Sequence, residues 1–299
     1  MSNTKKKFKL RRFLKMALVA VLLTVVVTYV AFSIYAVVAY TQSPNRSLGT
    51  TTPANWGLPY EDVSFASAAA DKLTIRGWFI HNPTSGRVLI LVHGQNATRL
   101  EHLDISKPLW DNDYNILLID MRGHGLSDGD HYTLGFYEQW DIVGAANYLK
   151  SRGFNPNAIG AMGWSMGAAS TIMAFSQTPD IKAIVSDSGY ANLSSLDGLL
   201  YPGALLTCRW LRGFDLEQIK PEEAITKIGS RHALVIQGDQ DHNVPVENAY
   251  KLKQAGGANV ELWVLPGVAH VSSFYAQPEA YLQRVLAFFD RELAKTVQN

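Results

Sequence analysis

A serine between two glycines, at a point where a strand pattern gives way to a helix pattern, is the feature that most narrows the fold. The Gly-x-Ser-x-Gly motif at 163–167 centres on Ser165, follows an apolar run at 158–162 and opens a helix-like segment at 166–176. In that context the motif is typical of a nucleophile elbow, a strained strand-to-helix turn that holds the serine hydroxyl clear of the backbone. The sequence therefore predicts a sharp turn with Ser165 as a candidate nucleophile.

Two further side chains follow in the order that such a serine needs. The apolar run 233–236 leads into a loop that carries Asp241, and the strand pattern 260–265 breaks at Pro266-Gly267 before His270. Serine, acid and histidine in this chain order is the order found with the nucleophile elbow, and it differs from the two common protease orders. These three residues form a candidate catalytic triad.

A loop upstream of the serine is the expected source of an oxyanion donor. The run 88–92 is typical of a buried strand, and it leads into a loop at 93–96 that contains Gln95. In folds with this elbow, one donor comes from that loop and the other from the residue after the nucleophile. We expect the backbone amides of Gln95 and Met166 to fill these places.

Together these motifs resemble the α/β-hydrolase superfamily, and more narrowly the bacterial membrane-anchored hydrolases of its prolyl-oligopeptidase-like and lysophospholipase-like branches. The matching pieces are His93-Gly94, the run Asp-Met-Arg-Gly-His-Gly-Leu-Ser at 120–127, the elbow at Ser165, the loop 238–245, and Pro266-Gly267 before His270. The resemblance implies an α/β-hydrolase fold, with a mostly parallel eight-stranded sheet, helices on both faces and a small cap. It also implies acyl transfer to water without a metal or organic cofactor.

The strand and helix patterns agree with that fold. Short apolar runs alternate with helical segments, as a mostly parallel sheet covered on both faces requires. The expected strands are 63–65 and 73–79 as an antiparallel pair, then 88–92, 116–119, 158–162, 183–186, 233–237 and 260–265. Helical spacing is found at 136–150 and 278–295.

Other residues compete for some of these roles. Asp239 and Asp187 also stand at predicted strand ends. Asp241 is preferred because its spacing to Val244-Pro245 fits the loop of the family, whereas Asp187 occupies the place of the acid in a minority of these enzymes. Asp120 and Arg122 are expected to brace the turn after their strand rather than to take part in the chemistry.

A basic tail followed by a long uncharged stretch predicts a membrane anchor. Seven Lys and Arg residues precede residues 16–40, which carry no charge. Such a stretch is long enough to cross a hydrocarbon core of about 30 Å as a helix. A cleaved signal peptide is the alternative, but its apolar region normally runs only about 7–15 residues. The positive-inside rule then keeps the N-terminus in the cytoplasm and places the catalytic domain outside the plasma membrane.

Charge and cysteine content exclude some other classes. The chain has a net charge of +1, so the seven basic residues of the tail leave about −6 for the rest. No basic patch interleaved with aromatic residues follows the tail, so nucleic-acid binding has no support. The lone Cys208 permits no intramolecular disulfide.

The predicted organisation is a cytoplasmic tail at 1–15, an anchor at 16–40, a linker at 41–59 and a hydrolase domain at 60–299. Within that domain the apolar segment 190–228 is longer than a plain crossover needs. We interpret it as a small cap over the site, suited to an acyl chain. Packing of the same residues on the sheet is the alternative.

The expected function is hydrolysis of carboxylic esters or thioesters, with a small-molecule or lipid ester as substrate and the membrane as partner. A serine peptidase of the prolyl-oligopeptidase-like type is the nearest rival, although those relatives usually add a further domain to admit peptides. A non-catalytic binding module is the alternative of another class. The presence of Ser165, Asp241 and His270 together argues against that module.

Overall fold

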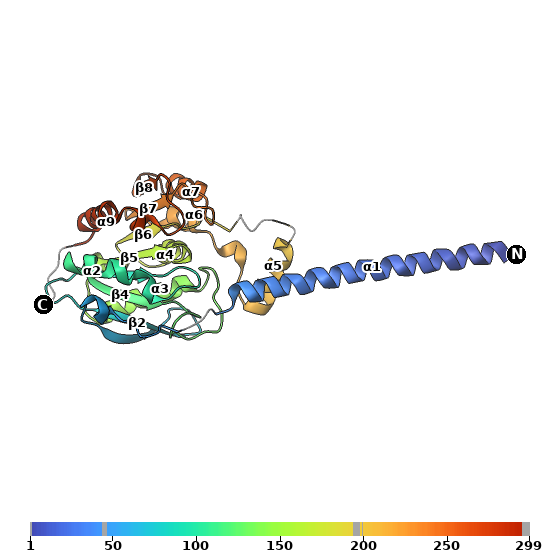
Figure 1. Ribbon diagram of the computed structural model, residues 1–299, viewed down its shortest axis with the longest axis horizontal. Helices are drawn as coiled ribbons and strands as arrows, with labels where there is room; N and C mark the ends of the chain where they lie inside the picture. The colour runs from blue at the N-terminus through green and yellow to red at the C-terminus, as the bar shows by residue number, and fades with distance from the viewer. Residues whose placement is uncertain (1, 44–46, 194–197, 199, 295–299) are drawn as a thin grey trace. The chain divides into compact units, whose positions relative to one another are not determined.

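The computed structural model describes residues 2–43, 47–193, 198 and 200–294. Parts of the predicted linker (44–46), of the predicted cap (194–197 and 199) and of the C-terminus (295–299) lie outside this description. The chain forms two compact units: Met1–Tyr40 with Leu196–Leu216, and Thr41–Ser195 with Glu217–Asn299. The second unit contains the sheet (Figure 1).

The sheet has eight strands in the order β1-β2-β4-β3-β5-β6-β7-β8. Only β2 runs opposite to the others, because it pairs antiparallel with both β1 and β4 while the remaining pairs are parallel. The strands are β1 (Glu61–Ala66), β2 (Thr74–Ile80), β3 (Val88–Val92), β4 (Asn115–Asp120), β5 (Ile159–Trp164), β6 (Ala183–Asp187), β7 (His232–Gly238) and β8 (Val260–Leu265).

This sheet confirms the predicted mostly parallel eight-stranded architecture, and every predicted strand is present. The runs 88–92 and 260–265 coincide with β3 and β8, and the other boundaries differ by one or two residues. The inner strands were visible in the sequence because both of their faces are buried, which leaves nearly continuous apolar runs.

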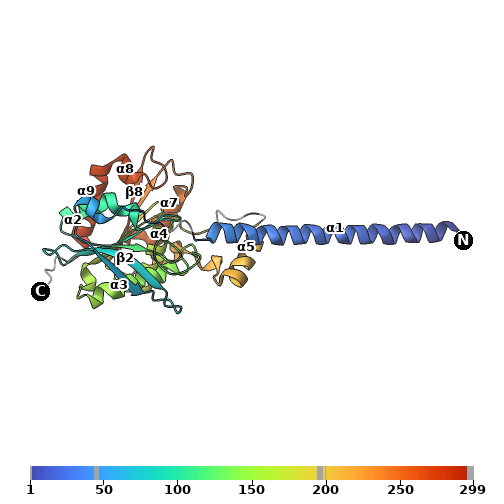
Figure 2. The same ribbon diagram turned by 60° about the horizontal axis from the view of Figure 1, so that its bottom comes forward.

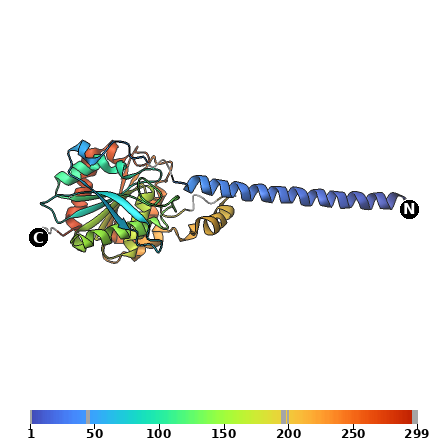
Figure 3. The ribbon, with the colours of Figure 1, turned by 90° about the horizontal axis from the view of Figure 1, so that it is seen from below.

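Helices cover both faces of the sheet. Figures 2 and 3 show α2 and α9 on one side and α3 on the other. In the core between the sheet and the first pair, Leu91 and Met162 are buried together with Leu109 of α2 and with Val285 and Phe289 of α9. The helices of this unit are α2 (Leu103–Asp111), α3 (Glu138–Ser151), α4 (Met166–Gln177), α6 (Pro221–Ala224), α7 (Glu247–Gly256), α8 (Ser273–Ala276) and α9 (Pro278–Glu292).

The strand order determines where the site forms. From β3 the chain passes to β4 on one side, and from β4 it crosses back to β5 on the other side of β3, so the topology reverses between the neighbouring strands β3 and β5. In open α/β sheets, ligands bind outside the carboxyl ends of the strands at such a switch point. The loop after β3 and the turn after β5, which carries Ser165, meet at that point.

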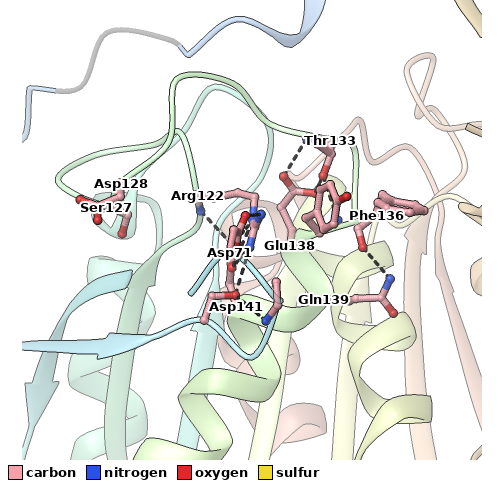
Figure 4. A network of polar contacts seen from close by, with 12 residues as sticks. Asp71, Arg122, Ser127, Asp128, Thr133, Phe136, Glu138, Gln139 and Asp141 are labelled. Carbon is pink, nitrogen blue, oxygen red and sulfur yellow. Dashed lines mark hydrogen bonds and ion pairs between the residues drawn. The ribbon is translucent and has the colours of Figure 1, made fainter. Parts of the chain in front are cut away.

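A buried guanidinium braces the loop after β4. Arg122 donates to both carboxylate oxygens of Asp141 in α3, and its Nη1 lies 2.8 Å from Asp71 Oδ2 (Figure 4). Glu138, one turn before Asp141, accepts hydrogen bonds from the backbone and the hydroxyl of Thr133. The contact with Asp141 supports the predicted bracing role of Arg122, because it joins the loop after β4 to α3 through two side chains that are almost wholly buried.

The first unit consists of helix α1 (Ser2–Thr41) and a short helical segment that follows β6 in the chain, namely α5 (Tyr201–Thr207) and a π-helical turn (Cys208–Arg212). The part of α1 from Lys5 to Thr41 is long and apolar enough to cross a membrane, a test that a signal sequence also passes. The predicted cap thus contributes residues to a unit with α1, and its place over the site stays a prediction.

Candidate active site

Ser165 occupies the predicted elbow. It lies between β5 and α4 with φ 55° and ψ −120°, a left-handed backbone conformation that is unusual for a residue with a side chain. Strain of this kind persists only where the surrounding structure enforces it, and it is concentrated at functional sites. A hydrogen bond from the neighbouring strand also holds the turn, since the Ser165 amide donates to the carbonyl of Asp187 on β6 at 2.9 Å.

The two motif glycines allow this turn to pack tightly. A Cβ at Gly167 would collide with the carbonyl oxygens of Val92 and His93, where the first turn of α4 crosses the end of β3. A Cβ at Gly163 would collide with the backbone of Gly167. The spacing of the motif therefore reflects backbone-to-backbone contact, which any larger residue would prevent.

His270 joins the predicted acid to the predicted nucleophile. Its Nε2 lies 2.9 Å from Ser165 Oγ, and its Nδ1 lies 2.6 Å from Asp241 Oδ2. The histidine side chain is 20% exposed, whereas the Asp241 side chain is fully buried. Three side chains that are up to 105 residues apart in the chain thus form one hydrogen-bonded series with a solvent-accessible end.

The loop after β7 holds Asp241 in place. Asp241 Oδ1 accepts the backbone amides of Asn243 and Val244 at 2.9 and 2.8 Å, and Oδ2 also accepts Gln237 Nε2 at 2.7 Å. These hydrogen bonds fix the orientation of the carboxylate and leave its Oδ2 directed at the imidazole. Sequence reasoning chose Asp241 by its spacing to Val244, and the contact with the Val244 amide gives that spacing a physical reason.

The two competing acids have other partners. Asp187 accepts hydrogen bonds from Tyr281 Oη at 2.9 Å, from Ser188 Oγ at 2.9 Å and from Ser273 Oγ at 3.2 Å. Burial raises the pKa of Asp187 to about 6, against these three hydrogen bonds, which lower it. Asp239 accepts the Gly267 amide at 2.7 Å and so fastens the turn that precedes His270.

The loop after β3 passes directly beside the serine. A Cβ at Gly94 would lie 3.3 Å from Ser165 Cβ. The Gly94 amide donates to Glu101 Oε2 at 2.7 Å, so that amide already has an acceptor. Next to it, Gln95 donates from its side chain to Tyr132 Oη at 2.6 Å. On the other side of Ser165, the Met166 amide is the first of α4 and has no partner within the helix.

Sequence reasoning missed Glu101. It belongs to the turn Arg99–His102, and burial raises its pKa to about 7 although the Gly94 hydrogen bond and the charge of His270 lower it. The Thr-x-x-Glu spacing from Thr98 is the signature of a capping box, which predicts a helix start. Thr98 does cap that turn, but the glutamate bonds to Gly94 instead.

A buried ion pair joins two loops at the site. Arg99 donates to Asp120 Oδ2 from Nε at 3.0 Å and from Nη2 at 2.8 Å, and its backbone amide donates to Oδ1. Burial raises the pKa of Asp120, but the charge and hydrogen bonds of Arg99, together with His93, outweigh burial and hold that pKa below its usual value. Asp120 also accepts the Leu126 amide, so it braces the turn after β4 as expected.

Neighbouring aromatic and histidine side chains support the site rather than line it. Trp164 is buried, its ring centroid lies 4.1 Å from that of the tilted His102 ring, and it donates to Tyr281 Oη at 3.1 Å. His93 bonds to the Gly94 carbonyl and to the Met121 amide, and burial lowers its pKa to about 3. A neutral His93 therefore shapes the loop after β3. Within the residues that the structure describes, no group of three or more His, Cys, Asp or Glu side chains could hold a metal ion.

Comparison with known proteins agrees with this geometry. A model of the prolyl oligopeptidase family matches residues 102–296. The chain is similar to the protein YfhR of Escherichia coli, with 25% identity over 225 residues that cover 72% of this chain and 76% of YfhR. Among solved structures, the Pyrococcus furiosus esterase Pf2001 is similar with a TM-score of 0.69 and 27% identity, over 84% of this chain and 100% of the esterase.

A dipeptidyl peptidase 4 from Porphyromonas gingivalis shares the fold, with a TM-score of 0.63 and 17% identity, over 79% of this chain and 36% of the peptidase. The family match covers more than half of the chain. The predicted α/β-hydrolase fold is thereby confirmed. The chain belongs to the prolyl oligopeptidase family of the α/β-hydrolase superfamily, and it is a serine hydrolase of the α/β type.

Proposed function

We propose that this protein hydrolyses carboxylic esters or thioesters of acyl or lipid-derived substrates and that α1 anchors it in a membrane. The hydrogen-bonded series Asp241–His270–Ser165 is the observation that carries the proposal. The esterase Pf2001, which is similar over its whole length, favours an ester as substrate.

The proposed chemistry follows from the partners of the two imidazole nitrogens of His270. Ser165 Oγ attacks the acyl carbon while His270 Nε2 accepts its proton, which makes a poor nucleophile reactive at neutral pH. His270 then gives that proton to the departing alcohol or thiol, and an acyl-serine remains. Water attacks the acyl-serine next, with the same nitrogen first taking its proton and then returning one to Ser165 Oγ. Asp241 fixes the tautomer and stabilises the imidazolium in both halves.

The backbone amides of Met166 and Gln95 are the proposed donors to the oxyanion of each tetrahedral intermediate. Met166 opens α4, whose N-terminal amides face the serine, and Gln95 follows Gly94 in the loop beside Ser165. The contact of Gly94 with Glu101 supports this assignment, because it fixes that loop and leaves Gln95 as the next donor in the chain. One such donor typically lowers the barrier by roughly 2.7–4 kcal/mol.

A membrane anchor accounts for the surface of α1. Its apolar side chains are exposed on successive faces of the helix, as at Val21, Leu22 and Leu23, each of which is more than half exposed. A helix that is apolar all round is stable in lipid or in a protein core, but not in water. The uncharged stretch 16–40 is also longer than the apolar region of a cleaved signal. We therefore propose a single-pass plasma-membrane protein with a cytoplasmic N-terminus and an extracytoplasmic hydrolase domain.

A peptidase is the second candidate, and the family match favours it. The same three side chains would serve both reactions, so the choice depends on the substrate that the site accepts. The detergent-solubilised protein should be tested with p-nitrophenyl esters of increasing chain length beside proline-containing peptide substrates.

The expected result is turnover of the esters that is lost in Ser165→Ala and kept in Ser176→Ala, a serine at the far end of the same helix. Turnover of peptides but not of esters would replace the esterase by the peptidase. Equal ester turnover by Ser165→Ala would remove the proposed nucleophile.

A further inference from the structure

The helical segment that follows β6 exposes large apolar side chains. Trp210 is 86% exposed, Leu211 58% and Leu206 56%, all within Tyr201–Arg212. A contiguous exposed group of this kind is unusual on a soluble surface and marks an interaction site. This segment, which we call the 201–212 segment, therefore needs an apolar partner on its outer side.

The inner side of the 201–212 segment packs on α1. Along α1, Tyr29, Ser33 and Val37 recur every four residues and are the side chains shielded on one face, whereas Val30 and Ile34 between them are exposed. A Cβ at Gly203 would collide with the Ser33 hydroxyl. Small residues at the contact let two helices approach closely, which is the usual device for helix packing inside membranes. Figures 1, 2 and 3 show α5 beside the C-terminal part of α1.

Hydrogen bonds between the 201–212 segment and α1 show in which direction the segment runs along the helix. The Gly203 amide donates to Tyr29 Oη at 3.0 Å, and Arg212 Nη2 donates to the Val38 carbonyl at 3.1 Å. The start of the segment thus contacts Tyr29 and its end contacts Val38, nearer the C-terminus of α1. The 201–212 segment therefore runs parallel to that part of α1. Its beginning lies deeper along the anchor than its end.

The depth of the 201–212 segment in the proposed bilayer follows from the rise per residue of α1. At 1.5 Å per residue, Tyr29 and Ser33 lie about 16 and 10 Å along the axis from Tyr40, where the uncharged stretch ends. Half of a hydrocarbon core is about 15 Å thick. Gly203 therefore reaches a level near the middle of the proposed bilayer, while Arg212 lies near its surface.

The composition of the segment matches that placement. Residues 198–208 carry no charge, and an apolar stretch of this length is too short to span a bilayer but suits a re-entrant segment. Arg209, Trp210 and Arg212 follow at the shallow end. Tryptophan and arginine are the residues expected at the level of the lipid headgroups.

We propose that the 201–212 segment is a re-entrant membrane element that enters the outer leaflet beside α1 and contacts acyl chains through Leu206 and neighbouring side chains. This inference rests on the proposed membrane anchor, because the level of the segment is set by its contacts with α1. It adds a second, non-spanning attachment to the bilayer from a part of the chain about 160 residues beyond the anchor.

Depth-dependent quenching tests this placement on the full-length protein in phosphatidylcholine and phosphatidylglycerol vesicles. The only cysteine is the buried Cys208, so a Cys208→Ser background permits an environment-sensitive fluorophore at Leu206→Cys, at Leu211→Cys, at Val26→Cys in α1 or at Tyr250→Cys on the exposed side of α7. Nitroxides on the middle of the acyl chain should remove most emission at Leu206→Cys and Val26→Cys. Nitroxides near the headgroup should be the more effective quenchers at Leu211→Cys, and neither should affect Tyr250→Cys.

The outcomes test the re-entrant segment and the membrane anchor separately. Emission at Leu206→Cys that resembles Tyr250→Cys, while Val26→Cys is quenched, would overturn the re-entrant segment and leave the anchor intact. An unquenched Val26→Cys would overturn the anchor and the segment together, with no bearing on ester hydrolysis at Ser165. Cooperative thermal unfolding of each labelled variant shows that a lack of quenching does not come from misfolding.

Discussion

At the scale of single residues, the imidazole of His270 connects the other two side chains of the candidate site. It bridges the hydroxyl of the partly buried Ser165 and a buried carboxylate that also accepts hydrogen bonds from Asn243, Val244 and Gln237. The acid therefore cannot turn away from the ring without giving up several hydrogen bonds. We propose that this arrangement holds His270, the candidate base, in the tautomer that catalysis requires.

Replacing the acid should separate Asp241 from Asp187. Asp241→Asn removes the acceptor for Nδ1–H and favours the wrong tautomer, so ester turnover should fall by about 10⁴. Asp187→Asn should cost much less, because that carboxyl bonds to Tyr281, Ser188 and Ser273 rather than to His270. Steady-state kinetics of both variants measure the difference. The reverse ranking would assign the acid to Asp187.

Sequence reasoning located these residues unequally well. Ser165, Asp241 and His270 could be found because each follows an apolar run within a short motif. The partners of Asp187 could not, since Tyr281 lies 94 residues away and nothing in the local pattern marks a buried carboxyl that needs a hydroxyl. The same holds for Arg99, the ion-pair partner of Asp120, which looks like an ordinary surface charge in the sequence.

At the scale of elements, burial decides what can be predicted. Strands buried on both faces, such as β3, are nearly continuous apolar runs and were found with their boundaries. The apolar segment after β6 was also recognised, but an apolar stripe shows only that one face needs cover. That the covering surface is the stripe Tyr29, Ser33 and Val37 of α1 is a long-range pairing that periodicity does not encode.

The loop after β3 should make stability depend on pH through Glu101. Its pKa is about 7 in the folded protein and 4.5 when exposed, so the folded state holds a proton that the unfolded state releases between these values. The free energy of unfolding should therefore decline as pH rises from about 4.5 to 7, by about 3 kcal/mol from this group. The neutral variant Glu101→Gln should lack this share of the decline.

Chemical denaturation of the detergent-solubilised protein at pH 4.5 and pH 8 measures the effect as the difference between the wild type and Glu101→Gln. The subtraction removes the contributions of other carboxyl groups, including Asp187. Parallel stability curves for the two proteins would show that Glu101 titrates as an ordinary exposed acid.

At the scale of the whole molecule, charge and hydropathy divide the chain before any fold is considered. The tail is basic, residues 16–40 carry no charge, and the remainder is mildly acidic. The structure shows the hydrolase unit and the unit of α1 with the 201–212 segment as separate compact bodies. The hydrolysis that we propose depends on the unit that contains the sheet, whereas membrane attachment depends on the unit of α1.

Labelling with a fluorophosphonate, followed by peptide mass spectrometry, examines the proposed nucleophile whatever ester or peptide the enzyme cleaves. The reagent should modify the solubilised protein at Ser165, because only a serine next to an organised base and oxyanion donors reacts readily. Ser165→Ala should fold normally and take up no label, while Ser176→Ala should label like the wild type. An adduct on another serine, or undiminished labelling of Ser165→Ala, would contradict the assignment of this site.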